Sequence, residues 1–230
     1  MRGKKSALAA GVAVAGACVL LAACSPVKMG SAAVVGNQRI TSATLDTDVS
    51  NLRQAVDKGN QVPTGQQPQA VLTWLVRFAI RDKVATQNGI SVNQTQVQSA
   101  LAELNVELEQ SAAQNGSGYS GLAKTLADNG VPPNLQKDLG QWEAQETAYV
   151  QKVNGGKLPT SQTAANNAVA KLTKADCQAA NSLHIQVSPQ YGQLSYDTST
   201  TLYGVSAPPN LLSLPGGPKA STSAPAFPSC

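Results

Sequence analysis

Apolar residues recur at intervals of three and four along most of the chain, which is the period of an amphipathic helix. Leu45, Val49 and Leu52 mark the first such stretch, and Thr41 is placed to be its N-cap. The same spacing predicts six helices, over residues 41–58, 68–88, 94–115, 122–127, 133–153 and 161–179. The second is apolar around most of its circumference, which predicts a central, buried helix.

Two short segments have the strand period of two instead. Residues 33–40 contain small and β-branched residues, with a turn at Gly36-Asn37. Residues 183–187 alternate apolar and polar side chains, and a return strand is expected near residues 194–196. Asn-Gly pairs follow four of the predicted helices, where glycine adopts the left-handed conformation that ends a helix.

The N-terminus has the features of a secretion signal. Three positive residues precede an apolar run that is too short to span a membrane in the mature protein. The run ends in Leu-Ala-Ala-Cys at residues 21–24, which resembles the bacterial lipobox. We expect residues 1–23 to be removed, Cys24 to carry lipid, and residues 24–31 to form a tether. The alternative is an ordinary signal peptide with a chance cysteine at that position.

Composition limits the remaining function classes. The signal carries most of the net charge of +4, so the mature chain is close to neutral. Nothing in that balance favours a nucleic-acid partner. Residues 32–204 have the length of one domain with a hydrophobic core. Residues 205–230 are rich in Pro, Ser, Gly and Ala, which predicts a disordered tail.

Two of the four cysteines remain as candidates for a disulfide. Cys18 leaves with the signal and Cys24 is assigned to lipid, which leaves Cys177 and Cys230. In an oxidising compartment these two cysteines can pair. The alternative is that Cys177 is a small buried residue on a helix and Cys230 a free terminal thiol.

Candidate catalytic residues are few. His184 is the single histidine, and no G-x-S-x-G motif accompanies it. The carboxylate pairs Glu103/Glu107 and Glu143/Glu146 share helix faces, but both pairs are predicted to lie on solvated surfaces. The sequence has no C-x-x-C, phosphate-binding or dinucleotide motif. We therefore expect no enzyme activity, no metal and no cofactor.

Three stretches carry a family resemblance. Residues 33–41 (AVVGNQRIT) are similar to a V-V-N-G-x-x-I-T strand and turn that leads into a first helix. Residues 87–97 (QNGISVNQTQV) look like a G-I-x-V-(S/T)-x-x-x-V link, and residues 126–153 look like a later helical pair. In this order, the segments resemble SurA-like and PrsA-like extracytoplasmic folding factors over residues 32–153, and more weakly over 161–192.

The resemblance implies a mainly helical fold like the N-terminal domain of SurA and the C-terminal region of trigger factor. It also implies a small sheet that pairs the N-terminal strand (about 33–40) with the late strand (about 183–188). Family members with prolyl isomerase activity have a parvulin domain before the last helix. Here only residues 155–160 occupy that place, so the isomerase activity is not expected.

Two functions follow as expectations. The first is a lipid-anchored, ATP-independent holdase that binds unfolded secreted polypeptides on the extracytoplasmic face of the cell membrane, or of the outer membrane in a two-membrane cell. The second is a structural or adaptor lipoprotein that binds one folded cell-envelope protein. A solute-binding lipoprotein is disfavoured, because the chain lacks the alternating strand–helix pattern of two α/β lobes.

Overall fold

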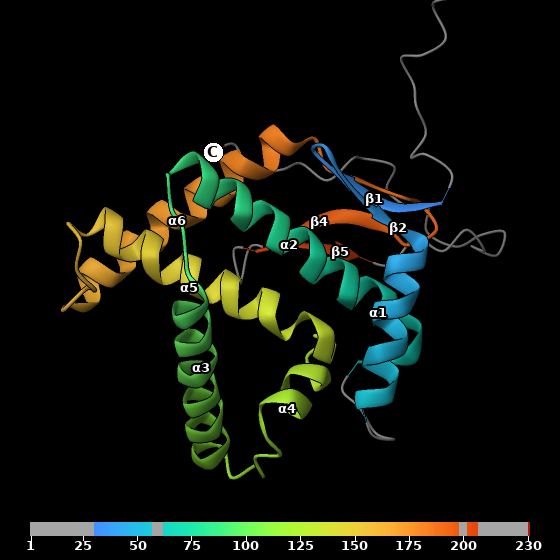
Figure 1. The fold of residues 1–230 in the computed structure, drawn as a ribbon, viewed down its shortest axis with the longest axis horizontal. Coiled ribbons are helices and arrows are strands. Elements are labelled where there is room, and N and C mark those ends of the chain that lie inside the picture. The colour runs from blue at the N-terminus through green and yellow to red at the C-terminus, as the bar shows by residue number, and fades with distance from the viewer. Residues whose placement is uncertain (1–29, 57–61, 198–201, 207–229) are drawn as a thin grey trace, which may run out of the picture.

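The fold is mainly helical, as predicted (Figure 1). The computed structural model describes residues 30–56, 62–197, 202–206 and 230, so the predicted signal and Cys24 lie outside the described residues. Within these ranges the chain forms six α-helices: α1 (Ser42–Ala55), α2 (Gln67–Gln87), α3 (Gln94–Gln114), α4 (Leu122–Asp128), α5 (Gln136–Val153) and α6 (Gln162–Leu183). Two 3₁₀ turns, η1 (Thr64–Gln66) and η2 (Pro133–Leu135), directly precede α2 and α5.

The helix ends follow the local sequence signals. Thr41 accepts a hydrogen bond from the backbone of Thr44 at the start of α1. Asn93 and Gln96 form a capping box at the start of α3. The Asn-Gly stops are confirmed, because a glycine with positive φ follows each of four helices: Gly89, Gly116, Gly130 and Gly155.

A three-stranded antiparallel sheet connects the beginning of the described chain to its later part. Its strand order is β2 (Gln38–Thr41), β1 (Ser31–Val35) and β3 (Gln186–Val187). In the central strand, Val34 lies opposite Gln186 of β3. The predicted pairing of the N-terminal strand with the late segment is therefore confirmed.

The late strand is shorter than predicted, and His184 does not lie on it. Helix α6 continues to Leu183, and His184 follows in the left-handed conformation with a φ of 47°. The backbone N–H of Gly36, in the β1–β2 turn, donates a hydrogen bond of 2.6 Å to the carbonyl of Leu183. This non-local contact satisfies a carbonyl of the last helical turn, which the local alternation of side chains does not indicate.

A second hairpin extends into the segment that was predicted to be disordered. Strands β4 (Gln193–Asp197) and β5 (Leu202–Ser206) pair antiparallel, and β5 packs against α2. Val205 is 7% exposed, and its backbone N–H donates to the Thr73 hydroxyl at 2.8 Å. The predicted domain boundary at residue 204 is therefore wrong by at least two residues, and residues 207–229 lie outside the described part.

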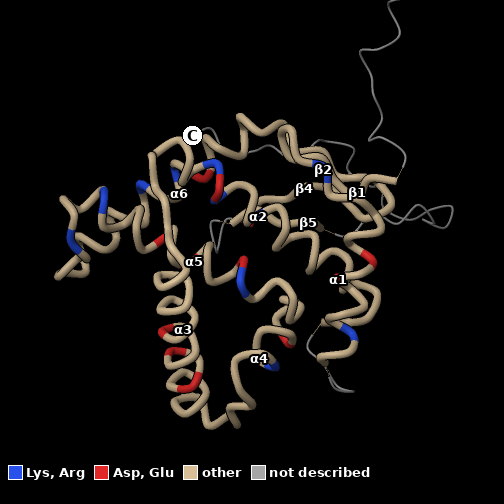
Figure 2. The backbone as a smooth tube through the Cα atoms, in the orientation of Figure 1, with Lys and Arg blue, Asp and Glu red and all other residues tan. Residues whose placement is uncertain are grey.

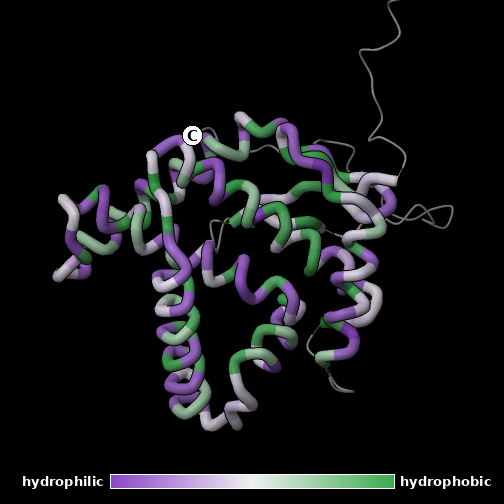
Figure 3. The backbone as a smooth tube through the Cα atoms, in the orientation of Figure 1, coloured by the Kyte–Doolittle hydropathy of each residue, from purple (hydrophilic) through white to green (hydrophobic). Residues whose placement is uncertain are grey.

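Helix α2 is the centre of the domain, as its apolar circumference predicts. It packs against α1, α5, α6 and β5, and Figure 3 shows hydrophobic residues recurring along it. Val71, Leu72 and Val76 have no exposed surface. Burying each such side chain contributes about 1.5–3 kcal/mol to folding. None of the helices in the described ranges combines the length and the hydropathy needed to cross a membrane.

Gly140 allows α5 to pack closely against α3. A Cβ atom at this position would lie 2.6 Å from Leu101 Cγ and 3.0 Å from Val97 Cγ1. We expect Gly140→Ala to lower the free energy of unfolding by about 1–3 kcal/mol, because the added methyl group overpacks the contact. The gain in helix propensity of about 1 kcal/mol offsets part of the cost of overpacking, and the range given is the net effect.

Chemical denaturation followed by circular dichroism measures this effect. Gly118→Ala is the control, because a Cβ atom at Gly118 meets no atom within 4 Å and its φ is not positive. The control is expected to change stability by less than about 0.5 kcal/mol. A Gly140→Ala protein as stable as the wild type would contradict the close packing of α3 on α5.

Candidate functional site

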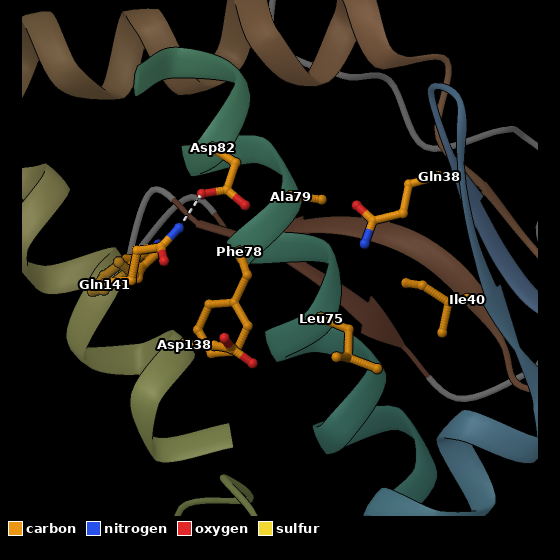
Figure 4. Close-up of a pocket in the computed structure, with 9 residues that line it drawn as sticks. Gln38, Ile40, Leu75, Phe78, Ala79, Asp82, Asp138 and Gln141 are labelled. Atoms are coloured by element: carbon orange, nitrogen blue, oxygen red, sulfur yellow. Dashed lines mark hydrogen bonds between the residues drawn. The ribbon is translucent and has the colours of Figure 1, made fainter. Parts of the chain in front are cut away.

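A cavity of about 160 Å³ lies between the β1–β2 hairpin and helices α2 and α5 (Figure 4). It is assembled from three segments that are far apart in the sequence. Its lining consists of Gln38 and Ile40 from β2, Leu75, Phe78, Ala79 and Asp82 from α2, and Asp138, Gln141 and Trp142 from α5.

The inner wall of the cavity is apolar. Leu75, Phe78 and Ala79 form one stripe of α2, since residues three and four apart lie on the same face. The Trp142 ring closes the α5 side and meets the Trp74 ring edge-on, with 6.2 Å between the centroids. The volume is similar to that of an engineered cavity of about 150 Å³ that binds benzene. The cavity therefore has room for one aromatic ring or one branched aliphatic side chain.

The rim is polar and acidic. Asp82 Oδ1 accepts hydrogen bonds from the side-chain amides of Gln141 (3.0 Å) and Gln145 (2.8 Å). Partial burial raises the pKa of the Asp138 carboxyl, and the negative charge of Asp82 raises it further, while Lys137 opposes the shift. The negative charges of these two lining carboxylates thus repel each other.

A buried arginine, Arg81, contacts the Trp142 ring that forms part of the cavity wall. Arg81 is 2% exposed, and its guanidinium donates to Glu146 Oε2 at 3.0 Å and to Asp176 Oδ2 at 3.1 Å. The same guanidinium lies over the Trp142 ring, 4.6 Å from its centroid. One side chain of α2 therefore contacts both α5 and α6, and it fixes the position of the cavity wall.

Burial is the main cause of the raised pKa values of two acidic groups near Arg81, Asp176 and Glu143. It raises the pKa of Asp176 to about 6, in spite of the opposing charge and hydrogen bond of Arg81. Burial, together with the charge of Glu146, raises the pKa of Glu143 to about 7. The prediction that Glu143 and Glu146 lie on a solvated surface is wrong, because α5 packs against α2, α3 and α6 and both residues are partly buried, with 34% of the Glu146 side chain exposed.

The Glu143 shift predicts that stability falls as the pH rises. A carboxyl whose pKa is higher in the folded than in the unfolded state binds more protons when folded, between pH 4.5 and about 7 for Glu143. Stability therefore decreases across that range. We expect Glu143→Gln to gain about 1–3 kcal/mol at pH 8 and little at pH 4, since one pKa unit corresponds to about 1.4 kcal/mol.

Urea denaturation at both pH values measures the gain. Figure 2 shows acidic residues along α3, and Glu103, which is exposed on this helix, provides the control variant Glu103→Gln. The control is expected to leave stability unchanged at both pH values. An equal effect of Glu143→Gln at pH 4 and pH 8 would contradict a raised pKa at this position.

The other sequence-predicted site residues do not join the cavity. Cys24 lies outside the described residues, whereas a disulfide links Cys177 on α6 to Cys230. His184 is exposed, and its Nδ1 lies 3.1 Å from the Ser182 carbonyl oxygen. Glu103 and Glu107 are exposed on α3. Within the described ranges, no group of three or more His, Cys, Asp or Glu side chains is placed to hold a metal.

Arg81 and Asp176 are the residues that sequence reasoning missed. The available signal was a charged residue in the middle of a helix that was predicted to be buried all round. Such a charge requires a partner, because an unpaired buried guanidinium is costly. The sequence does not indicate which of the acidic residues supplies the partner.

The cavity combines apolar groups with acidic and amide groups. Its lining residues comprise five apolar side chains, two carboxylates and two amides, with no histidine, cysteine or hydroxyl group. Comparisons with known protein families, with curated proteins and with solved structures found no match to this chain. A function for the cavity therefore has to be inferred from its own geometry and chemistry.

Proposed function

We propose that the protein is a lipid-anchored, ATP-independent holdase that binds unfolded segments of secreted polypeptides. The observation that carries the proposal is the cavity between β2, α2 and α5, which has an apolar inner wall and a polar rim. The lipobox-like residues 21–24 and the resemblance to SurA-like folding factors support the same function.

The size of the cavity suits weak, reversible binding. One apolar side chain of an extended client enters it, and its burial is worth about 1.5–3 kcal/mol. A dissociation constant of about 1 mM corresponds to about 4 kcal/mol, so contacts of the client backbone with the rim are needed even for that affinity. Rapid release follows from this weak binding, and no nucleotide-driven step is required.

Filling the cavity tests the proposal. Ala79 is half-buried on the inner wall, so Ala79→Phe occupies the space without removing an existing contact. The purified wild-type protein is expected to slow the aggregation of a chemically denatured client, measured by light scattering. Ala79→Phe is expected to lose most of this effect while keeping the wild-type circular dichroism spectrum.

A matched control comes from a second cavity of about 190 Å³ between α3 and α5, which is lined mainly by Ala, Thr, Ser and Gln residues. Ala100→Phe places the same ring in that cavity and is expected to retain the holdase effect. If the wild-type protein neither slows aggregation nor binds unfolded peptide, the proposal is wrong.

An adaptor that binds one folded envelope protein is the second candidate. The large apolar side chains that are strongly exposed in the described part come from separate segments: Val106 on α3, Leu158 after α5 and Val169 on α6. Exposed residues scattered in this way do not form the contiguous apolar patch that a broad client-binding surface would need. Crosslinking in cells separates the two functions, since a holdase captures many unrelated secreted proteins and an adaptor captures one.

A further inference from the structure

We infer that the cavity prefers an apolar client side chain with a lysine or arginine next to it in the client sequence. The inference rests on the proposed function and adds a charge preference to it. Its basis is the position of two carboxylates, Asp82 and Asp138, on the rim of one apolar cavity. They come from different helices, α2 and α5; in the view of Figure 4, Asp82 lies above Phe78 and Asp138 overlaps the lower edge of the Phe78 ring.

Both carboxylates retain acceptor capacity towards the cavity. The two amide donors to Asp82 both bind Oδ1, and within the described ranges Oδ2 accepts no hydrogen bond. The Asp138 carboxylate likewise accepts none from the part of the chain that the structure describes. A carboxylate oxygen accepts strongly from a cationic donor, so these oxygens are suited to an ammonium or guanidinium group.

The charges around the rim make a cation favourable. Asp138 experiences the negative charges of Asp82 and Asp48, and only Lys137 opposes them. Arg81 precedes Asp82 in the sequence, but its guanidinium is already paired with Glu146 and Asp176. A cation bound between the carboxylates would relieve their repulsion, whereas an anionic client residue would increase it.

Lysine and arginine side chains also match the shape of the site. Their aliphatic stems can lie along the apolar wall while the charged end reaches the exposed rim. An exposed ion pair is worth about 0.2–1 kcal/mol, and a cation that reached both rim carboxylates would gain up to about twice that. We therefore expect a preference of about three- to tenfold for a basic neighbour over a neutral one, and less at high salt.

Three fluorescent peptides test the preference against the purified protein. Each contains one central phenylalanine, flanked by two lysines, two glutamines or two glutamates, in an otherwise identical Gly/Ser sequence. Fluorescence anisotropy at low ionic strength is expected to give the tightest binding for the lysine peptide and the weakest for the glutamate peptide. Ala79→Phe is expected to weaken the binding of all three.

Asp138→Asn is the diagnostic variant, because Asp138 is exposed and accepts no hydrogen bond from the described residues. It is expected to weaken lysine-peptide binding more than glutamine-peptide binding, so that the preference for lysine falls severalfold. Asp46→Asn is the control, an exposed carboxyl on α1 that does not line the cavity, and it is expected to change neither affinity.

The outcomes separate the two proposals. If all three peptides bind equally, or if the lysine preference persists in Asp138→Asn, the charge preference is overturned and the holdase proposal stands. If no peptide binds, or if Ala79→Phe binds them as well as the wild type does, the cavity is not the client site and both proposals fail.

Discussion

Replacing Arg81 with methionine is expected to lower the free energy of unfolding at pH 8 by about 3–5 kcal/mol. The guanidinium is 2% exposed and is paired with Glu146 and Asp176, so its removal leaves carboxylates without their counter-ion between α2, α5 and α6. The contact with the Trp142 ring is lost as well. Chemical denaturation followed by tryptophan fluorescence measures the change.

The loss is expected to be smaller at pH 5 than at pH 8. The pKa of Asp176 is already raised to about 6 by burial, and removing Arg81 raises it further. Below this pKa the carboxyl is protonated and neutral, so the uncompensated charge disappears. Lys171→Met, a change at an exposed position on α6, is the control and is expected to cost less than about 0.5 kcal/mol.

A compensated variant separates the lost pairing from general damage to packing. Arg81→Met combined with Asp176→Asn and Glu146→Gln removes both unpaired charges. It is expected to recover much of the stability, because a buried ion network and a neutral replacement of similar volume are often close in free energy. Equal losses in the single and triple variants would show that packing of the Arg81 stem, rather than charge, stabilises the junction.

Loss of the Cys177–Cys230 disulfide is expected to destabilise the protein by about 4 kcal/mol. The bond connects residues 53 apart, and the closed loop contains β3, β4 and β5. Opening that loop increases the conformational entropy of the unfolded chain. Cys230→Ser is the preferred change, since Cys230 is exposed at the C-terminus whereas Cys177 is buried in α6.

Reduction provides the control for this prediction. A reducing agent is expected to lower the stability of the wild-type protein to that of Cys230→Ser and to leave the variant unchanged. Hydrogen exchange should then show faster opening of β4 and β5, which lie within the loop, than of α1, which lies outside it. A wild-type protein whose stability is insensitive to reduction would contradict the prediction.

Local patterns were sufficient for most of the helical fold. The interval of three and four residues placed α1 to α6, and Thr41, Asn93 and the Asn-Gly pairs marked helix ends, because capping depends on a few neighbouring residues. The apolar circumference of α2 likewise indicated a central position. The pairing of β1 with β3 required more than local pattern, and it followed from the family resemblance.

The tertiary structure alone showed where the non-local contacts fall. His184 caps α6 next to Leu183, whose carbonyl accepts a hydrogen bond from the turn at Gly36. Val205 lies in a strand that packs against α2. The sequence pattern put Glu143 and Glu146 on a solvent-exposed helix face, but the packing of α2, α3 and α6 around α5 partly buries them. The candidate site also depends on non-local contacts, because its lining comes from β2, α2 and α5 and forms only when these elements pack together. Sequence periodicity shows which face of a helix is buried, but it does not show which other element covers that face.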